Sequence, residues 1–291
     1  MLVQAHSFRP SPAFLFHSHR QNPIISRPLH FNVSWLNEVA KWQSRRSKCR
    51  VMRVSASEEQ SSSFNVGKNR KVVEHLSLLK TKEDLSDEEE KDMLDFLYTT
   101  QYQMGGILSI SLGRISNQNA ENYSHAVYMR FQRKDDLEKF YERPFYLGVL
   151  KEHVFPYCHG LLNVDYESEV EDDIYPIFRK GEEFSYGVEF MLLISFVENA
   201  AEPVKDALAS LQSLAMGFPS LIVQSTQGQN FNLSSQEYTH GVVIRFRSFE
   251  AFQLFKGSTE YKDLWRTKFE MITRRTLSVY FTVDPVGTEV M

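Results

Sequence analysis

The stretch YSHAVYMRF at residues 123–131 returns as YTHGVVIRF at residues 238–246, 115 positions further along the chain. The same spacing relates other residues, among them Glu74 and Glu189. No net insertion separates the two copies. Chance matches do not keep register over such a length, so the sequence encodes one fold twice.

Each copy predicts the same order of elements. In the first copy, a strand begins at Val72, and a helix follows in which Ser86 and Glu89 form a capping box. Two strands come next, and then two short helices separated by Pro144, the second one beginning at Tyr146. A closing strand ends the copy. This β-α-β-β-α-β order is typical of a ferredoxin-like unit.

A ferredoxin-like unit packs its helices on one face of an antiparallel sheet, so the other face must be covered. We therefore expect an α+β fold in which two tandem units pair sheet to sheet as a dimeric α/β barrel. The expected divisions of the chain are a lead-in at 57–71, a first unit at 72–166, an acidic linker at 167–187, a second unit at 188–283 and a tail at 284–291.

The first 56 residues have a composition of their own. They contain nine Lys or Arg residues, and their single acidic residue is Glu38. A segment that is rich in Arg and Ser and poor in acidic residues is typical of an organelle transit peptide. We expect residues 1–56 to direct the protein to the chloroplast, with the mitochondrion as the alternative.

Charge limits the partners of the remaining chain. Removal of nine basic residues from 33 and one acidic residue from 37 leaves 24 against 36, a net charge near −12. Such a surface repels phosphate groups, so nucleic acid and anionic membranes are not expected partners. Outside the predicted transit peptide, Cys158 is the only cysteine, so no disulfide is expected within that part.

Three motifs resemble the stress-responsive dimeric α/β barrel proteins of plants, also called stress-response A/B barrel proteins. They are the Tyr-Ser/Thr-His lead-in of both copies, the opening strand VVEHL at residues 72–76 and the segment ERPFYLG at residues 142–148. The resemblance implies a homodimeric or tandem barrel with a link to stress. The tandem form that carries a transit peptide is similar to the plastid members.

Some members of that family are polyketide cyclases that need no cofactor. The resemblance implies a His as the base and a Tyr six residues before it. Here those positions hold Tyr146 and Phe140 in the first unit, and Tyr261 and Phe255 in the second. A tyrosine with an ordinary pKa near 10 is a poor base at neutral pH. We therefore do not expect the cyclase activity.

Two histidines are the catalytic candidates, because both copies keep them at the same strand position: His125 and His240. Each could face a ligand at the barrel mouth or bond to a neighbouring loop. His75 has Phe190 as its counterpart, which favours the first unit as the binding half. The full set of expected ligand-binding residues is His75, Tyr123, His125, Tyr146, Tyr238, His240 and Tyr261.

The resemblance also implies a Mg²⁺ ion on backbone carbonyls at the end of the first helix. The matching residues are Tyr98, Gln101 and Met104. No other cofactor is expected.

Together, these features predict a non-enzymatic, stress-related plastid protein. We expect it to bind a small apolar or carbonyl-bearing molecule, or to act through self-association as an internal pseudo-dimer or homodimer. The alternative is an enzyme of the dimeric α/β barrel superfamily that needs no cofactor. It would be similar to a polyketide cyclase or to a monooxygenase.

Overall fold

The computed structural model describes residues 69–171 and 186–283. The predicted transit peptide at 1–56 and the predicted tail at 284–291 lie outside the described residues. So do most of the lead-in and residues 172–185 of the predicted linker.

The first repeat follows the predicted order. Its elements are β1 (Asn69–Thr81), α2 (Asp87–Gln103), β2 (Ile107–Arg114), β3 (His125–Phe131), α3 (Lys134–Glu142), α4 (Pro144–Val149), the π-helical turn η1 (Leu150–Val154) and β4 (Cys158–Glu171). The predicted capping box is present, because the Ser86 Oγ accepts from the Glu89 N–H at 3.2 Å and Glu89 Oε2 accepts from the Ser86 N–H at 3.0 Å. Helix α4 begins at Pro144 rather than at Tyr146, since the first turn of a helix leaves its N–H groups unpaired.

The second repeat has the same order. Its elements are β5 (Val188–Phe196), α6 (Ala201–Met216), β6 (Ile222–Gln229), β7 (His240–Phe246), α7 (Phe249–Gly257), α8 (Thr259–Leu264), the π-helical turn η2 (Trp265–Phe269) and β8 (Thr273–Thr282). Within the described ranges, no helix has the length and apolar character needed to cross a bilayer.

Both repeats form a four-stranded antiparallel sheet. The strand order is β2-β3-β1-β4 in the first repeat and β6-β7-β5-β8 in the second. These are the same order at equivalent positions, and in each sheet the first strand in sequence is an inner strand. The predicted α+β fold of two ferredoxin-like units is therefore confirmed.

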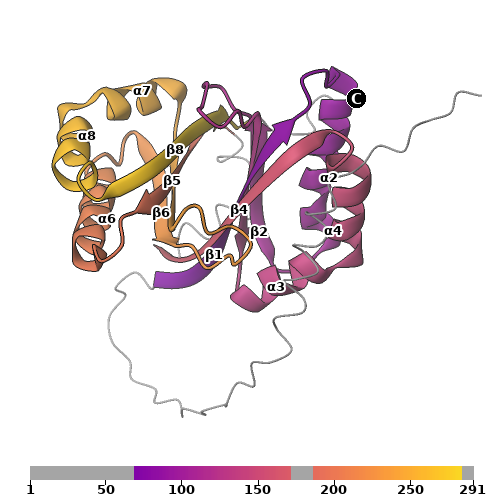
Figure 1. Cartoon of the computed structure of the whole chain (residues 1–291), viewed down its shortest axis with the longest axis horizontal. Coiled ribbons are helices and arrows are strands. Elements are labelled where there is room, and N and C mark those ends of the chain that lie inside the picture. Colours follow the sequence, from indigo (N-terminus) through magenta and orange to yellow (C-terminus); the bar gives the residue numbers. More distant parts are fainter. Residues whose placement is uncertain (1–68, 172–185, 284–291) are drawn as a thin grey trace, which may run out of the picture. The chain divides into compact units, whose positions relative to one another are not determined.

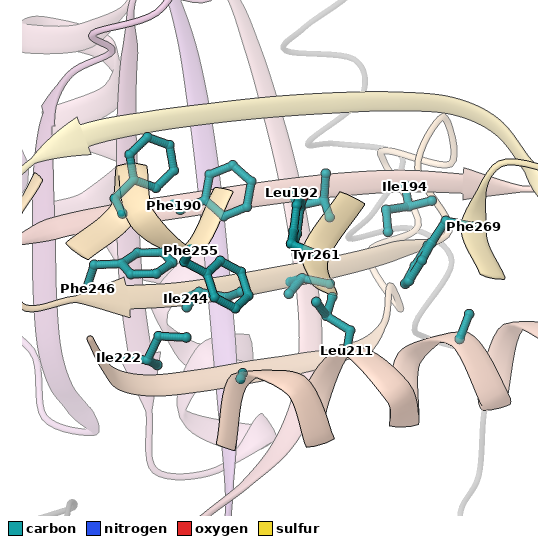
Figure 2. Packing of buried hydrophobic residues seen from close by; sticks show 14 of the residues in the cluster. Phe190, Leu192, Ile194, Leu211, Ile222, Ile244, Phe246, Phe255, Tyr261 and Phe269 are labelled. Carbon is teal, nitrogen blue, oxygen red and sulfur yellow. The ribbon is translucent and has the colours of Figure 1, made fainter. Parts of the chain in front are cut away.

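Helices cover one face of each sheet (Figure 1). In the first repeat, Val73 and Phe131 from the sheet share a buried cluster with Met93 of α2 and Phe140 of α3. We call such a cluster, between a sheet and its helices, the helix-side cluster of that repeat. Figure 2 shows the corresponding cluster of the second repeat, in which residues of β5 and β7 face α6 and α7: Phe190, Leu192, Ile194, Leu211, Ile244, Phe246 and Phe255.

The other faces of the two sheets pack on each other. One buried cluster takes side chains from both repeats: Leu76, Leu78, Tyr128, Val164 and Tyr166 from the first, and Met191, Leu193, Val243, Val279 and Phe281 from the second. Strand β4 lies against β6, and β2 lies against β8. The predicted sheet-to-sheet pairing is thus present within one chain.

Glycine allows the sheets to approach closely where they meet. A Cβ atom on Gly228 would lie 2.5 Å from the Glu167 carbonyl oxygen and 2.8 Å from the Tyr166 ring. A Cβ atom on Gly113 would lie 3.0 Å from the Phe281 ring. Gly113 and Gly228 are equivalent in the repeats, as are Tyr166 and Phe281. Each repeat therefore places an aromatic ring against the glycine of the other.

Two buried Glu–Arg pairs lie inside the barrel at equivalent positions. Glu74 and Arg130 are cross-strand neighbours, with Oε1 2.5 Å from Nη2. Glu189 and Arg245 repeat this arrangement, with Oε2 2.6 Å from Nε. Each of the four residues is at most 3% exposed. Ser111 of the first repeat donates to Glu189 Oε2 at 3.0 Å, so a polar contact also joins the two sheets.

Removing one partner of a buried pair should be far more harmful than removing both. Arg245→Leu leaves the Glu189 carboxylate buried without its guanidinium, and we expect the free energy of unfolding to fall by about 3–5 kcal/mol. The double variant Glu189→Leu/Arg245→Leu should lose less. Denaturant unfolding of both variants measures the difference, and equal losses would contradict this account.

Candidate functional site

His75 lies on an inner strand of the first sheet, on the face that the helices cover. Side chains alternate along a strand, so His75 shares this face with Val73 of the helix-side cluster. The imidazole is fully buried. Its cross-strand neighbour on β4 is Asp165, whose Oδ1 lies 2.7 Å from His75 Nδ1. A buried His–Asp pair is therefore the core of the candidate site.

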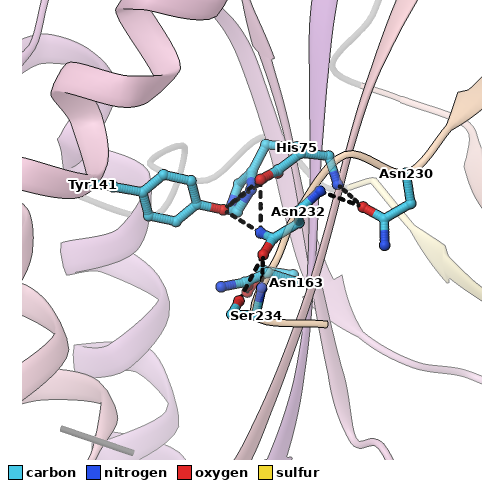
Figure 3. A network of polar contacts seen from close by, with 8 residues as sticks. His75, Tyr141, Asn163, Asn230, Asn232 and Ser234 are labelled. Atoms are coloured by element: carbon cyan, nitrogen blue, oxygen red, sulfur yellow. Dashed lines mark hydrogen bonds and ion pairs between the residues drawn. The ribbon is translucent and has the colours of Figure 1, made fainter. Parts of the chain in front are cut away.

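Tyr141 and Asn232 complete a hydrogen-bonded group around Asp165. Figure 3 shows Tyr141 and Asn232 next to His75. Tyr141 comes from α3, and its hydroxyl donates to Asp165 Oδ2 at 2.9 Å. Asn232 comes from the β6–β7 loop of the second repeat. Its Nδ2 donates to Asp165 Oδ2 at 2.7 Å and to the Tyr141 hydroxyl oxygen at 3.1 Å. We call His75, Tyr141, Asp165 and Asn232 the His75 site.

The contact with Asp165 shows which nitrogen of the His75 imidazole carries the proton. A carboxylate only accepts hydrogen bonds, so in the neutral imidazole the proton is on the His75 Nδ1 that faces Asp165, and Nε2 presents a lone pair. Nε2 is buried, and it has no hydrogen-bond partner among the residues that the structure describes. This nitrogen can therefore accept a hydrogen bond or a proton from a bound molecule.

Aromatic rings surround the imidazole. The ring centroids of Phe131, Phe140 and Tyr141 lie 6.4, 5.8 and 5.5 Å from that of His75. Tyr146, one of the expected ligand-binding residues, packs on Phe140 at 3.9 Å. Burial raises the pKa of the Tyr146 hydroxyl, so this group stays protonated. These rings give the His75 imidazole a largely apolar environment.

The second repeat replaces this polar group. Its residues at the positions of His75, Tyr141 and Asp165 are, in the same order, Phe190, Lys256 and Tyr280. The Lys256 Nζ lies 4.9 Å from the centroid of the Phe190 ring, and burial lowers the pKa of this amine. A cation over an aromatic ring thus stands where the first repeat has a His–Asp pair.

His125, a catalytic candidate, is not part of the His75 site. It pairs with Leu79, which lies four residues beyond His75 on β1 and thus roughly 13 Å away. The His125 Nε2 lies 2.6 Å from Glu90 Oε1. A hydrogen bond from Arg114, with help from His125, holds the pKa of the Glu90 carboxyl at about 2 despite its partial burial. Both nitrogens of His125 have partners, since Nδ1 meets a serine hydroxyl at 3.0 Å.

His240, the other catalytic candidate, has a simpler environment. Its Nδ1 lies 3.0 Å from the Thr239 Oγ1, and its ring meets that of Phe196 edge-on at 5.0 Å. Burial lowers the pKa of this imidazole to about 4.

The remaining tyrosines expected to bind ligand lie apart from the His75 site. Tyr123 and Tyr238 hold equivalent positions just before β3 and β7. The Tyr238 hydroxyl donates to the Glu121 carboxylate, and the Lys80 Nζ lies 4.5 Å from the centroid of the Tyr123 ring. Tyr261 belongs to the helix-side cluster of the second repeat.

The predicted magnesium ligands lie at the end of α2. Gln101 is in its last turn and Met104 is its C-cap, where helix carbonyls lack an intrahelical donor. The Tyr98 carbonyl accepts from the Gln101 Nε2 at 3.3 Å. Among the described residues, no three His, Cys, Asp or Glu side chains cluster as metal ligands would. Magnesium on these backbone carbonyls stays a prediction.

The sequence singled out His75 but not its partners. Asp165 carries one signal, because it is an acidic residue in the largely apolar closing strand LLNVDY at 161–166. Nothing in the local sequence marks Tyr141 or Asn232, since both depend on contacts with distant parts of the chain.

Comparison with known proteins confirms the resemblance. Residues 73–168, within the first repeat, match the family model described as Stress responsive A/B Barrel Domain. The chain is also similar to a stress-response A/B barrel domain-containing protein of Arabidopsis thaliana. The two are 26% identical over 270 residues, which cover 91% of this chain and 95% of that protein.

Two solved structures share the fold across both repeats. One is a candidate monooxygenase of Fusobacterium nucleatum, with a TM-score of 0.53 and 7% identity over 74% of this chain and 93% of that one. The other is an anthrone oxidase-like protein, with a TM-score of 0.53 and 9% identity over 73% of this chain and 91% of that one. At these identities the likeness concerns the fold alone.

The environment of His240 predicts how stability depends on pH. An unfolded chain protonates this residue near pH 6.5, whereas the folded protein resists protonation until about pH 4. Stability should therefore fall as the pH drops from about 6.5 to 4, because the unfolded state binds the additional proton. His240→Gln should show a smaller fall when unfolding is measured at pH 7.5 and pH 4.5. The same change at the exposed His159 is the control, and an unchanged pH profile in His240→Gln would contradict the assignment.

Proposed function

We propose that the protein binds a small enolisable carbonyl compound at the His75 site of its first repeat, in a stress-related role in the plastid. The observation that supports this proposal is the buried His75 Nε2, which lacks a partner among the described residues. An unpaired buried polar atom costs about 1–3 kcal/mol, and a ligand that donates a hydrogen bond would remove that cost.

The hydrogen-bonding role of the His75 Nε2 limits which ligands can bind. Because Asp165 engages the protonated Nδ1, the free nitrogen accepts rather than donates. A plain ketone offers only an acceptor, whereas an enol or a phenol offers a hydroxyl donor. The rings of Phe131 and Phe140 would contact the apolar part of such a molecule. This favours small-molecule binding over action through assembly alone.

The His–Asp pair favours catalysis as a second candidate function. The His75 Nε2 would take the α-proton of the bound carbonyl compound, and the electron pair of the broken C–H bond would form an enolate. Asp165 would stabilise the resulting imidazolium, which exchanges the proton with solvent before the enolate carbon takes a proton back. This is a reaction without a cofactor, as in the cyclase-like alternative, with His75 as the base in place of His125 or His240.

Ethyl acetoacetate in D₂O tests both candidate functions with one probe. Saturation-transfer NMR reports binding, and loss of the α-proton signal above the buffer rate reports proton transfer. We expect the full chain to bind the ester, and His75→Gln to abolish that binding. If His75 is also a base, the variant should exchange about 10²–10⁴-fold more slowly than the wild type.

His240→Gln is the matched control, because it changes the same residue type outside the site. Equal binding by wild type and His75→Gln would refute the proposed function. Binding without exchange would leave the protein a binding protein and remove the catalytic candidate.

The plastid location rests on the composition of residues 1–56. A fluorescent fusion of the full chain should overlap with chlorophyll in plant cells, and a fusion that begins at residue 57 should not. Overlap with a mitochondrial marker would replace the plastid proposal with the mitochondrial one.

A further inference from the structure

We propose that Asn232 is a positioning residue, by which the second repeat completes the His75 site of the first. The inference rests on the proposed function for its consequence in binding. Its structural core, the control of the His75 tautomer, can be tested without any ligand.

Two hydrogen bonds to the backbone of Asp165 hold the β6–β7 loop on the first repeat. The Phe231 N–H donates to the Asp165 carbonyl at 2.8 Å, and the Asp165 N–H donates to Asn230 Oδ1 at 3.1 Å. The Asn230 side chain also donates to the Tyr238 carbonyl at 2.9 Å, which closes the loop on itself. The loop therefore docks on the very residue that pairs with His75.

The loop also sets the orientation of the Asn232 amide. Asn232 Oδ1 accepts from the Ser234 N–H at 2.9 Å and from the Ser234 hydroxyl at 2.6 Å. With its oxygen engaged there, the Nδ2 group points at Asp165 and Tyr141 (Figure 3). Asn232 is 7% exposed, so its amide has exchanged water for these partners.

This donor reinforces the proton position that Asp165 sets, because it acts on the Tyr141 hydroxyl and on Asp165 Oδ2. The Tyr141 oxygen lies 2.9 Å from Asp165 Oδ2 and also 3.1 Å from His75 Nδ1. A hydroxyl that donated to Nδ1 would require the imidazole proton on Nε2 instead, which would remove the free lone pair. Asn232 holds the carboxylate and the phenol oxygen together, and so favours donation to Asp165 and the proton on Nδ1.

The reciprocal loop of the first repeat provides the contrast. Asn117 stands at the position equivalent to Asn232. It bonds to the backbone of β8, with its Nδ2 3.0 Å from the Ser278 carbonyl oxygen and its Oδ1 2.9 Å from the Tyr280 nitrogen. In each repeat, a loop thus contacts the other repeat. Only the β6–β7 loop of the second repeat donates a hydrogen bond to a His–Asp pair.

The tautomer of His75 is the direct readout. In the wild type, the imidazole ¹⁵N shifts should show the proton on Nδ1. Asn232→Ala should give a mixture of the two tautomers. Asn232→Leu keeps a side chain of similar size and removes the donor without adding a charge next to Asp165, so it should give the same result if the alanine variant does not fold. Asn117→Ala is the matched control and should leave the His75 shifts at their wild-type values.

The ester assay separates this inference from the proposed function. We expect Asn232→Leu to reduce the binding of ethyl acetoacetate, and any exchange to slow by up to about 100-fold, as it does when reacting groups are misplaced. A shifted tautomer in a protein that never binds the ester would support the positioning role and refute the proposed function. Wild-type ¹⁵N shifts in both Asn232 variants would overturn the inference itself.

Discussion

Each four-stranded sheet has helices on one face only, and the rest of the structure depends on burying the other face. The partner sheet of the same chain does this, through a cluster that draws apolar side chains from both repeats. Two glycines, Gly113 and Gly228, make room for the rings of Phe281 and Tyr166 at the meeting point of the sheets. Because both sheets are in one chain, the pairing forms at a high effective concentration.

The buried Glu–Arg pairs impose a second condition on that interface. A buried ion pair contributes little net stability compared with apolar residues. An arrangement of the sheets that leaves one of its charges without a partner is, however, strongly destabilised. Glu189 also accepts from Ser111 of the other repeat, so its hydrogen bonding is complete only when the sheets meet in one register. We interpret these pairs as a constraint on how the sheets align.

Within this shared fold the two repeats differ at the location of the His75 site. The first has a His–Asp pair between its sheet and its helices, and the second has aromatic rings and Lys256 there. The strands pair in the same way at both locations, His75 with Asp165 and Phe190 with Tyr280, so the difference is one of side chains. The β6–β7 loop then links the repeats again, because it carries Asn232 to the site that the second repeat has lost.

The sequence by itself determined the architecture. Its evidence was local: the repeat, the capping box at Ser86 and Glu89, and the order of strands and helices. Local patterns of this kind can be recognised without a structure. It also placed His75 in the more promising half, from Phe190 at the equivalent position. Only the tertiary structure assembled the His75 site, since Tyr141, Asp165 and Asn232 are far apart in the chain. Strand register brings Asp165 beside His75, and the docking of a loop from the other repeat adds Asn232. Such contacts depend on how distant segments of the chain pack together, and the spacing of residues along the sequence does not contain this information.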